Sequence, residues 1–216
     1  MNSLIRQKLM EMFERMLDRF GPQDWWPART EFEMMVGAIL TQNTNWGNVE
    51  KAIVRLKNEK LLSLDALRSL PHTALAERIN PAGYYNIKAT RVKNLIQFIE
   101  ERYDGDIEKL LKEETGELRK GLLSVNGIGP ETADSIVLYG AKRPIFVVDA
   151  NTYRILRRHE MVEDQINYDA LQELFMDHLP DDVELFNEFH ALLVKTGKEY
   201  CRKKPICCDC PLEKWH

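Results

Sequence analysis

Apolar residues recur at intervals of three and four along almost the whole chain, and this pattern constrains the fold more than any other feature. That spacing gathers apolar side chains on one face of an α-helix, and it predicts amphipathic helices over residues 4–20 and 89–103. Glycine- and proline-containing breakers separate the helical segments. The β-rich run at residues 145–148 is short and does not alternate like a half-buried strand. The sequence therefore predicts an all-α fold. Further helices are predicted over residues 31–42, 47–59, 64–70, 73–79, 117–124, 131–141, 151–158, 168–178 and 183–197.

Length and composition limit the chain to one sizeable core or two modest domains. It has 216 residues, of which 44% are hydrophobic and 30% charged, as in globular rather than disordered proteins. Apolar runs such as residues 34–40 are too short to cross a bilayer, and the N-terminus lacks the apolar stretch of a secretory signal. We expect a monomeric cytoplasmic protein with no membrane partner.

The most informative segment is a Gly-Ile-Gly turn at residues 127–129, between an apolar helix and a helix that begins at Pro130. Two glycines allow positive φ and keep side chains away from a ligand, and exposed N–H groups at a helix start suit a phosphate oxygen. Asp149 follows an apolar run 20 residues beyond Gly129. A bare Gly-x-Gly turn is more often an ordinary helical hairpin, but the aspartate beyond it favours a functional site.

Together the 127–129 turn, Thr132 with Ala133, and the run ending at Asp149 resemble the helix-hairpin-helix, Gly-Pro-Asp superfamily of base-excision DNA glycosylases, which includes endonuclease III. The resemblance extends over nearly the whole chain. It implies two helical domains flanking a cleft. Residues 29–143 would carry the hairpin, and residues 1–28 plus 144–216 would carry the catalytic aspartate and a C-terminal cysteine-rich loop.

The resemblance also implies double-stranded DNA containing a damaged base as the partner. Gln42 and Asn43 would enter the hole left by the flipped base, and Tyr84 would wedge the opposite strand, offsetting part of the lost stacking. The alternatives are a capped helix for the amides and a packed turn for the tyrosine. The predicted DNA-binding residues are Gln42, Asn43, Tyr84, Gly127, Ile128, Gly129 and Thr132.

Glu131 indicates which chemistry to expect. Family members that also cleave the backbone have a lysine at this position, which forms a Schiff base with C1′, and a carboxylate cannot supply that amine. The prediction is a monofunctional glycosylase that hydrolyses the N-glycosidic bond. Asp149 would be the catalytic residue, stabilising an oxocarbenium-like sugar and orienting water. Its alternative role is a helix N-cap, and both roles can hold together.

The tryptophans suggest which base leaves. The segment around Trp25 and the position of Trp46 resemble the branch of the family that excises alkylated purines such as 3-methyladenine. Such a base is cationic, so its glycosidic bond is already weakened, and indole faces attract cations. The predicted base pocket contains Trp25, Pro27, Trp46 and Glu131. The alternative for the 25–26 pair is to pin the N-terminal helix to the core.

Two other functions remain open at this point. One is a different glycosylase of the same fold, acting on mismatched or oxidised bases or using another lysine as an endonuclease III-like glycosylase and AP lyase. The other is a non-enzymatic helix-hairpin-helix module that binds DNA.

All four cysteines lie in the last 16 residues, which suits a metal or cluster site better than a disulfide framework. The segment resembles the family's [4Fe–4S] loop, but its spacing departs from that pattern. Cys201, Cys207 and Cys210 would be ligands, with Cys208 or His216 as the fourth. Thiolates suit iron–sulfur clusters and zinc alike, so a zinc site is the alternative and free thiols the third choice.

The net charge of −4 hides an uneven distribution. Residues 159–192 contain ten acidic side chains and no lysine or arginine, which leaves the remainder at +6. We expect the acidic stretch to be a solvated face turned from the duplex, and DNA binding to weaken steeply with salt. The basic residues expected near phosphate lie in the segments 88–93, 142–143, 154–158 and 202–204.

Overall fold

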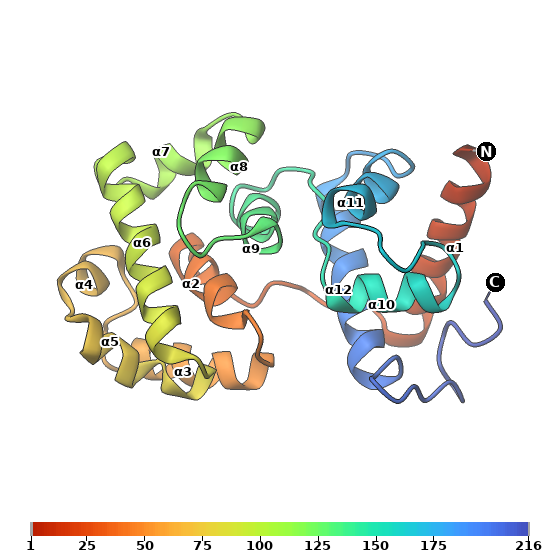
Figure 1. Cartoon of the computed structure of the whole chain (residues 1–216), viewed down its shortest axis with the longest axis horizontal. Coiled ribbons are helices and arrows are strands. Elements are labelled where there is room, and N and C mark those ends of the chain that lie inside the picture. Colours follow the sequence, from red (N-terminus) through yellow and green to blue (C-terminus); the bar gives the residue numbers. More distant parts are fainter. Residues whose placement is uncertain (1, 216) are drawn as a thin grey trace. The chain divides into compact units, whose positions relative to one another are not determined.

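The structure, a computed structural model, describes residues 2–215, and every regular element among them is a helix (Figure 1). This confirms the predicted all-α class. None of these helices is long and apolar enough to span a membrane. The chain divides into two units. Unit 1 consists of Met1–Trp26 and Arg143–His216, and unit 2 of Pro27–Lys142.

Unit 2 is built around α2, which is buried from Phe32 to Leu40 and contacts α3, α6 and the segment after α9. Polar caps fix where its first helices begin. The side chain of Thr30 accepts the backbone N–H of Glu33, and that of Asn45 starts α3 in the same way. The elements are α2 (Glu31–Thr41), α3 (Trp46–Asn58), α4 (Leu64–Ser69), α5 (His72–Arg78), η1 (Asn80–Ala82), α6 (Tyr85–Tyr103), α7 (Ile107–Lys112), α8 (Thr115–Leu123), α9 (Pro130–Ser135) and η2 (Ile136–Gly140).

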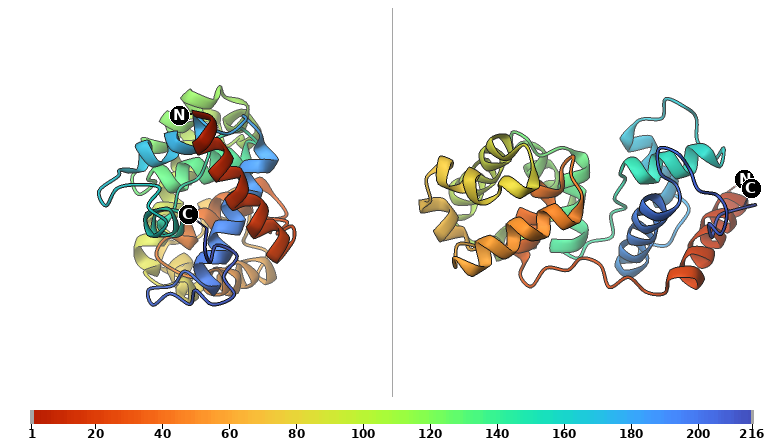
Figure 2. Two further views of the ribbon diagram at one scale, coloured as in Figure 1. Left: turned by 90° about the vertical axis from the view of Figure 1, so that its right-hand side faces the viewer. Right: turned by 90° about the horizontal axis from the view of Figure 1, so that it is seen from below.

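Unit 1 is built around α12, which contacts α10 and lies along α1 (Figure 2). Its elements are α1 (Asn2–Phe20), α10 (Ala150–Arg158), α11 (Tyr168–Met176) and α12 (Val183–Glu199). The ring of Phe146 stacks on Phe175 at 3.8 Å between centroids and meets Phe186 and Phe189 edge-on. The apolar run at residues 145–148 is therefore buried core beside helices, with no strand pairing among the described residues.

Two local features differ from the sequence prediction. Helix α7, which has six residues, was not predicted from the apolar spacing. The single helix expected over residues 131–141 is α9 followed by a π-helical turn, η2, in which the N–H of Ala141 donates to the carbonyl of Ile136 at 3.0 Å. At the end of that turn Gly140 packs so tightly that a Cβ would lie 2.4 Å from the methyl carbon of Met34.

Candidate functional site

The hairpin turn joins α8 to α9 in unit 2, as Figure 1 shows. Gly127 has φ +95°, and a Cβ there would lie 2.3 Å from the Cγ of Arg91, so both conformation and space require glycine. Gly129 is instead extended, with φ −95°, so only one of the two glycines uses positive φ. A Cβ at Gly129 would meet nothing within 4 Å, which leaves the backbone open on that side. Ile128, between the two glycines, is buried.

Gln42 connects the end of α2 to this hairpin. Its Nε2 donates to the carbonyl of Gly127 at 3.1 Å and to the hydroxyl of Thr132 at 2.9 Å. Arg91 of α6 donates to the Oε1 of Gln42. The structure therefore brings together Gln42, Gly127 and Thr132, which the sequence analysis selected separately. Asn43, next along the chain, is exposed and has a left-handed backbone with φ +52°.

Tyr84 lies at the start of α6 with a left-handed backbone of φ +47°, and its side chain is 68% exposed. Tyr85 and Ile87 are also exposed large apolar residues on the same turn of chain. The sequence analysis selected only Tyr84, because the family resemblance put that residue at the wedge position.

Asp149 is the N-cap of α10 in unit 1. Its Oδ1 accepts the backbone N–H of Thr152 at 2.8 Å and the Thr152 hydroxyl at 3.0 Å, and its Oδ2 accepts the Nδ2 of Asn151 at 2.6 Å. Arg154 in turn donates to the Oδ1 of Asn151 at 2.6 Å and to the carbonyl of Cys201. The cap function that sequence analysis raised as an alternative is thus present, and the half-buried carboxylate is held in one orientation.

Gly197 of α12 makes room for this arrangement. A Cβ at this position would lie 2.4 Å from the Oδ1 of Asn151, so only glycine lets α12 approach the amide that donates to Asp149. The sequence signal was a glycine inside a helical pattern, which the periodicity argument passed over.

Two titratable groups of α12 lie within electrostatic range of Asp149. Burial lowers the pKa of Lys198, and the Asp149 charge partly opposes that shift. Burial likewise lowers the pKa of His190, again with Asp149 opposing. The Nζ of Lys198 lies 5.8 Å from the ring centre of Trp25, within the range of a cation–π contact. Trp25 and Asp149 therefore share Lys198 as a neighbour, a residue that sequence analysis did not select.

The remaining predicted pocket residues belong to unit 2. Trp46 is the half-buried first residue of α3, Pro27 is exposed, and Glu131 is exposed in the first turn of α9. Trp25 belongs to unit 1, where its ring meets Trp26 edge-on at 5.3 Å. A single pocket formed by all four residues stays a prediction.

The C-terminal loop encloses a cavity of about 460 Å³. Cys201, Cys207 and Cys210 line it, while Cys208 is exposed and donates to the Asp209 carboxylate. Arg158 donates to the Cys201 sulfur at 3.1 Å. Three thiols around one cavity suit a thiolate-bound group, although no three His, Cys, Asp or Glu side chains within residues 2–215 are grouped closely enough to hold a metal ion. His216 lies outside the described residues.

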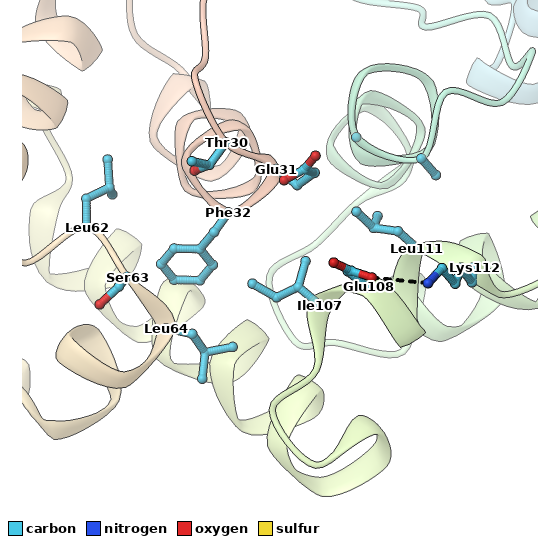
Figure 3. Close-up of a pocket in the computed structure, with 12 residues that line it drawn as sticks. Thr30, Glu31, Phe32, Leu62, Ser63, Leu64, Ile107, Glu108, Leu111 and Lys112 are labelled. Carbon is cyan, nitrogen blue, oxygen red and sulfur yellow. Dashed lines mark hydrogen bonds and ion pairs between the residues drawn. The ribbon is translucent and has the colours of Figure 1, made fainter.

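Another cavity, of about 530 Å³, lies in unit 2 between the start of α2 and helix α7 (Figure 3). Phe32, Leu64 and Ile107 supply much of its apolar wall. None of the predicted site residues lines it. This cavity is therefore separate from the site selected by sequence.

The basic segments are less available to phosphate than their sequence suggests. Lys88 is 1% exposed, so the expectation that it meets DNA is wrong. Lys93 donates to three backbone carbonyls at the end of α4. Residues 142–143 and 202–204 are exposed, as are nine of the ten acidic side chains within residues 159–192.

Comparison with known proteins identifies the family. Residues 36–181 match the family model described as HhH-GPD superfamily base excision DNA repair protein. A Methanocaldococcus jannaschii protein designated a candidate DNA repair glycosylase is 46% identical over 97% of this chain and 96% of its own length. Thermotoga maritima endonuclease III is 27% identical over 84% of this chain and 80% of its own.

Solved structures agree with this relationship. The Helicobacter pylori 3-methyladenine DNA glycosylase bound to 1,N6-ethenoadenine superposes with a TM-score of 0.76 at 29% identity, covering 92% of this chain and 97% of that one. An endonuclease III trapped covalently on DNA superposes with a TM-score of 0.82 over 96% and 93% of the two chains, and its 22% identity supports the fold. The chain belongs to the helix-hairpin-helix, Gly-Pro-Asp superfamily and is a DNA glycosylase of base excision repair.

Proposed function

We propose that this protein is a monofunctional DNA glycosylase that hydrolyses the N-glycosidic bond of an alkylated purine. The observation that carries the proposal is the fixed carboxylate of Asp149, held by Thr152 and Asn151 at the start of α10 with Trp25 and Lys198 nearby. A carboxylate oriented before the substrate arrives stabilises developing positive charge without reorganisation at the moment of reaction.

In the proposed reaction the bond between C1′ and the base nitrogen breaks and its electron pair leaves with the base. The sugar becomes oxocarbenium-like, and Asp149 stabilises that charge. Water, oriented by Asp149, then adds to C1′ and transfers a proton to the Asp149 carboxylate. Glu131 offers no amine for attack on C1′, and it is exposed in the first turn of α9. The expected product is an abasic site in an intact strand.

An alkylated purine is favoured as the substrate for two reasons. The loop containing Trp25 and the position of Trp46 resemble the branch that excises such bases, and the H. pylori relative of that activity is 29% identical. Indole rings hold a flat base by stacking, and a cationic base adds a charge attraction. Lys198 already lies over the Trp25 ring, so the charge attraction is weaker there than at Trp46.

A second candidate function is a bifunctional glycosylase and AP lyase that uses Lys198. Burial lowers the pKa of this amine, which raises its neutral, nucleophilic fraction, and Asp149 lies within electrostatic range. The amine would displace the base at C1′ and lose a proton, and breaking of the C1′–O4′ bond would then give a Schiff base, which borohydride reduces to a permanent adduct.

One assay separates these functions. Purified protein is incubated with duplexes carrying N3- or N7-methylpurines, oxidised pyrimidines or mismatches, and released base and strand cleavage are measured. We expect release of methylpurine, no strand cleavage and no borohydride-trapped adduct. A trapped adduct that disappears in Lys198→Met would establish the bifunctional alternative. Activity on oxidised pyrimidines without release of methylpurine would overturn the proposed substrate.

We propose that the C-terminal cysteines hold a [4Fe–4S] cluster, with zinc as the alternative. Support comes from three thiols lining one cavity and from the relationship to endonuclease III enzymes. Bound there, the cluster would organise the loop that carries Arg202, a structural role. Cys208 lies outside the cavity lining, which disfavours it as the fourth ligand.

The test compares the iron and acid-labile sulfide contents of matched variants. Cys210→Ser should lose most of the iron, while Cys208→Ser should retain it. Equal loss from both variants would make Cys208 a ligand, and zinc without sulfide would replace the cluster.

A further inference from the structure

Lys88 of α6 is a buried charge without a function in the catalytic proposal. Its side chain is 1% exposed, and its Nζ donates to the carbonyl of Leu40 at 2.8 Å and to the carbonyl of Ala82 at 2.7 Å. Both acceptors are neutral backbone groups. Burying an ammonium against carbonyls alone is costly, and a methionine or leucine would fill the same space without that cost. The donor capacity of Lys88 therefore needs an explanation beyond packing.

The two carbonyls belong to the segments that carry the proposed DNA-reading side chains. Leu40 lies in the last turn of α2, directly before the chain that presents Gln42 and Asn43. Ala82 ends η1, two residues before the exposed Tyr84. One ammonium thus holds two loops that are about 40 residues apart in sequence.

Both loops contain backbone conformations that require external support. Asn43 and Tyr84 have left-handed φ values of +52° and +47°, which are uncommon for residues with a side chain. Gly83 also has positive φ, at +69°. A hydrogen bond to the carbonyl just before each turn fixes where the turn begins.

A second contact from the same face of α6 reinforces the arrangement. Arg91, one helical turn beyond Lys88, donates to the side chain of Gln42, which itself donates to the hairpin at Gly127. Helix α6 therefore connects to all three predicted DNA-contacting segments of unit 2. Within this set of contacts, Lys88 joins the turn that contains Asn43, after α2, to the turn that contains Gly83 and Tyr84, before α6; these are called the Asn43 turn and the Tyr84 turn.

We propose that Lys88 is a positioning residue that fixes the spacing between the Asn43 turn and the Tyr84 turn, so that both side chains enter the duplex at the same damaged base pair. This inference rests on the proposed glycosylase function. It assigns no contact between Lys88 and the DNA.

The test uses the full-length protein and DNA that carries a tetrahydrofuran abasic-site analogue with 2-aminopurine opposite, whose fluorescence rises when the opposite base is unstacked. The variant is Lys88→Met, which keeps the length of the side chain and removes the donors. Lys93→Met is the matched control, because Lys93 also lies on α6 and donates to carbonyls, but at the end of α4.

At saturating protein we expect Lys88→Met to give at least a threefold smaller fluorescence rise than wild type, with affinity for undamaged DNA unchanged within twofold. Lys93→Met should keep the full rise. In a Tyr84→Ala background, Lys88→Met should cause no further loss, because the two residues act through one turn. Lys88→Gln keeps a shorter hydrogen-bond donor and should give an intermediate fluorescence rise. It replaces Lys88→Met as the test variant if the methionine variant does not fold.

The outcomes distinguish this inference from the function on which it rests. Equal fluorescence from wild type and both Lys88 variants, or an equal loss from Lys93→Met, would overturn the positioning role alone. A wild-type protein that produces no rise on this DNA would overturn the proposed function and the positioning role together.

Discussion

Replacing Asp149 with asparagine separates the two roles that the structure gives this residue. Asparagine is as good an N-cap as aspartate, so its oxygen can still accept the backbone N–H of Thr152. Its amide nitrogen would face the Nδ2 of Asn151, which now donates at 2.6 Å, and two donors cannot bond. The structural cost is therefore one hydrogen bond, about 1 kcal/mol.

The catalytic cost should be much larger. Loss of a preorganised electrostatic group lowers the rate of such reactions by about 10²–10³-fold, or about 3–4 kcal/mol. We expect Asp149→Asn to lower the single-turnover rate of base release by at least that factor, while the unfolding temperature falls by only about 2–4 °C. Asn151→Ala is the matched control, because it removes the same hydrogen bond and keeps the carboxylate.

Single-turnover kinetics with protein in excess, together with thermal unfolding, measure both quantities. The catalytic assignment fails if Asp149→Asn stays within threefold of the wild-type rate. It also fails if Asn151→Ala loses as much activity as Asp149→Asn, because orientation of the loop would then explain the whole effect.

Three further predictions follow from charges in the structure. Lys198→Met removes the cation over Trp25. In a competition assay the ratio of cationic methylpurines to neutral lesions released should therefore rise about tenfold, or about 1.4 kcal/mol. An unchanged ratio would contradict this prediction. Arg202, Lys203 and Lys204 are exposed, and a triple variant with alanine at all three positions should bind DNA with a weaker dependence on salt. The slope of log affinity against log salt should fall by about 0.9 for each phosphate that the loop no longer neutralises. An unchanged slope in a titration of fluorescent duplex would exclude the loop from the interface. Burial, with the nearby charge of Arg91 adding to its effect, lowers the pKa of Lys88 to about 8. In the unfolded chain the pKa of a lysine is about 10.4, so between pH 8 and about pH 10.4 the unfolded chain binds more protons than the folded one. The free energy of unfolding of wild type should therefore rise with pH in this window by up to about 1.4 kcal/mol per unit relative to Lys88→Met, and denaturant titrations at pH 7.5 and 9.5 should detect the difference.

The sequence was most informative where local patterns determine the outcome. Apolar periodicity predicted the helical class and nearly every long helix, because burying one face of each helix is a local requirement. The family was also predicted correctly, since the hairpin glycines, Thr132 with Ala133 and Asp149 occur in a characteristic order and spacing. Helix α7 was missed, and the π turn was predicted as part of one regular helix over residues 131–141.

Long-range contacts were the part that could not be predicted. The bond from Gln42 to Gly127 joins residues 85 positions apart, and that from Lys88 to Leu40 joins residues 48 apart. Lys88 was expected near phosphate because it belongs to the basic segment 88–93, one of those that the family resemblance assigns to DNA. Neither its burial nor the approach of Lys198 to Trp25 has a local signature in the sequence.

The order of the two units along the chain has a consequence for synthesis. Unit 2 is one continuous segment, Pro27–Lys142, whereas unit 1 needs α1 and the chain after Arg143 together. On a ribosome, unit 2 can fold as soon as it emerges, while α1 must wait for α12. Until then the apolar face of α1, which includes Leu9, Met12 and Met16, has no surface to cover it. That face therefore stays uncovered through most of translation, and the nascent chain is open to association through α1 until α12 emerges.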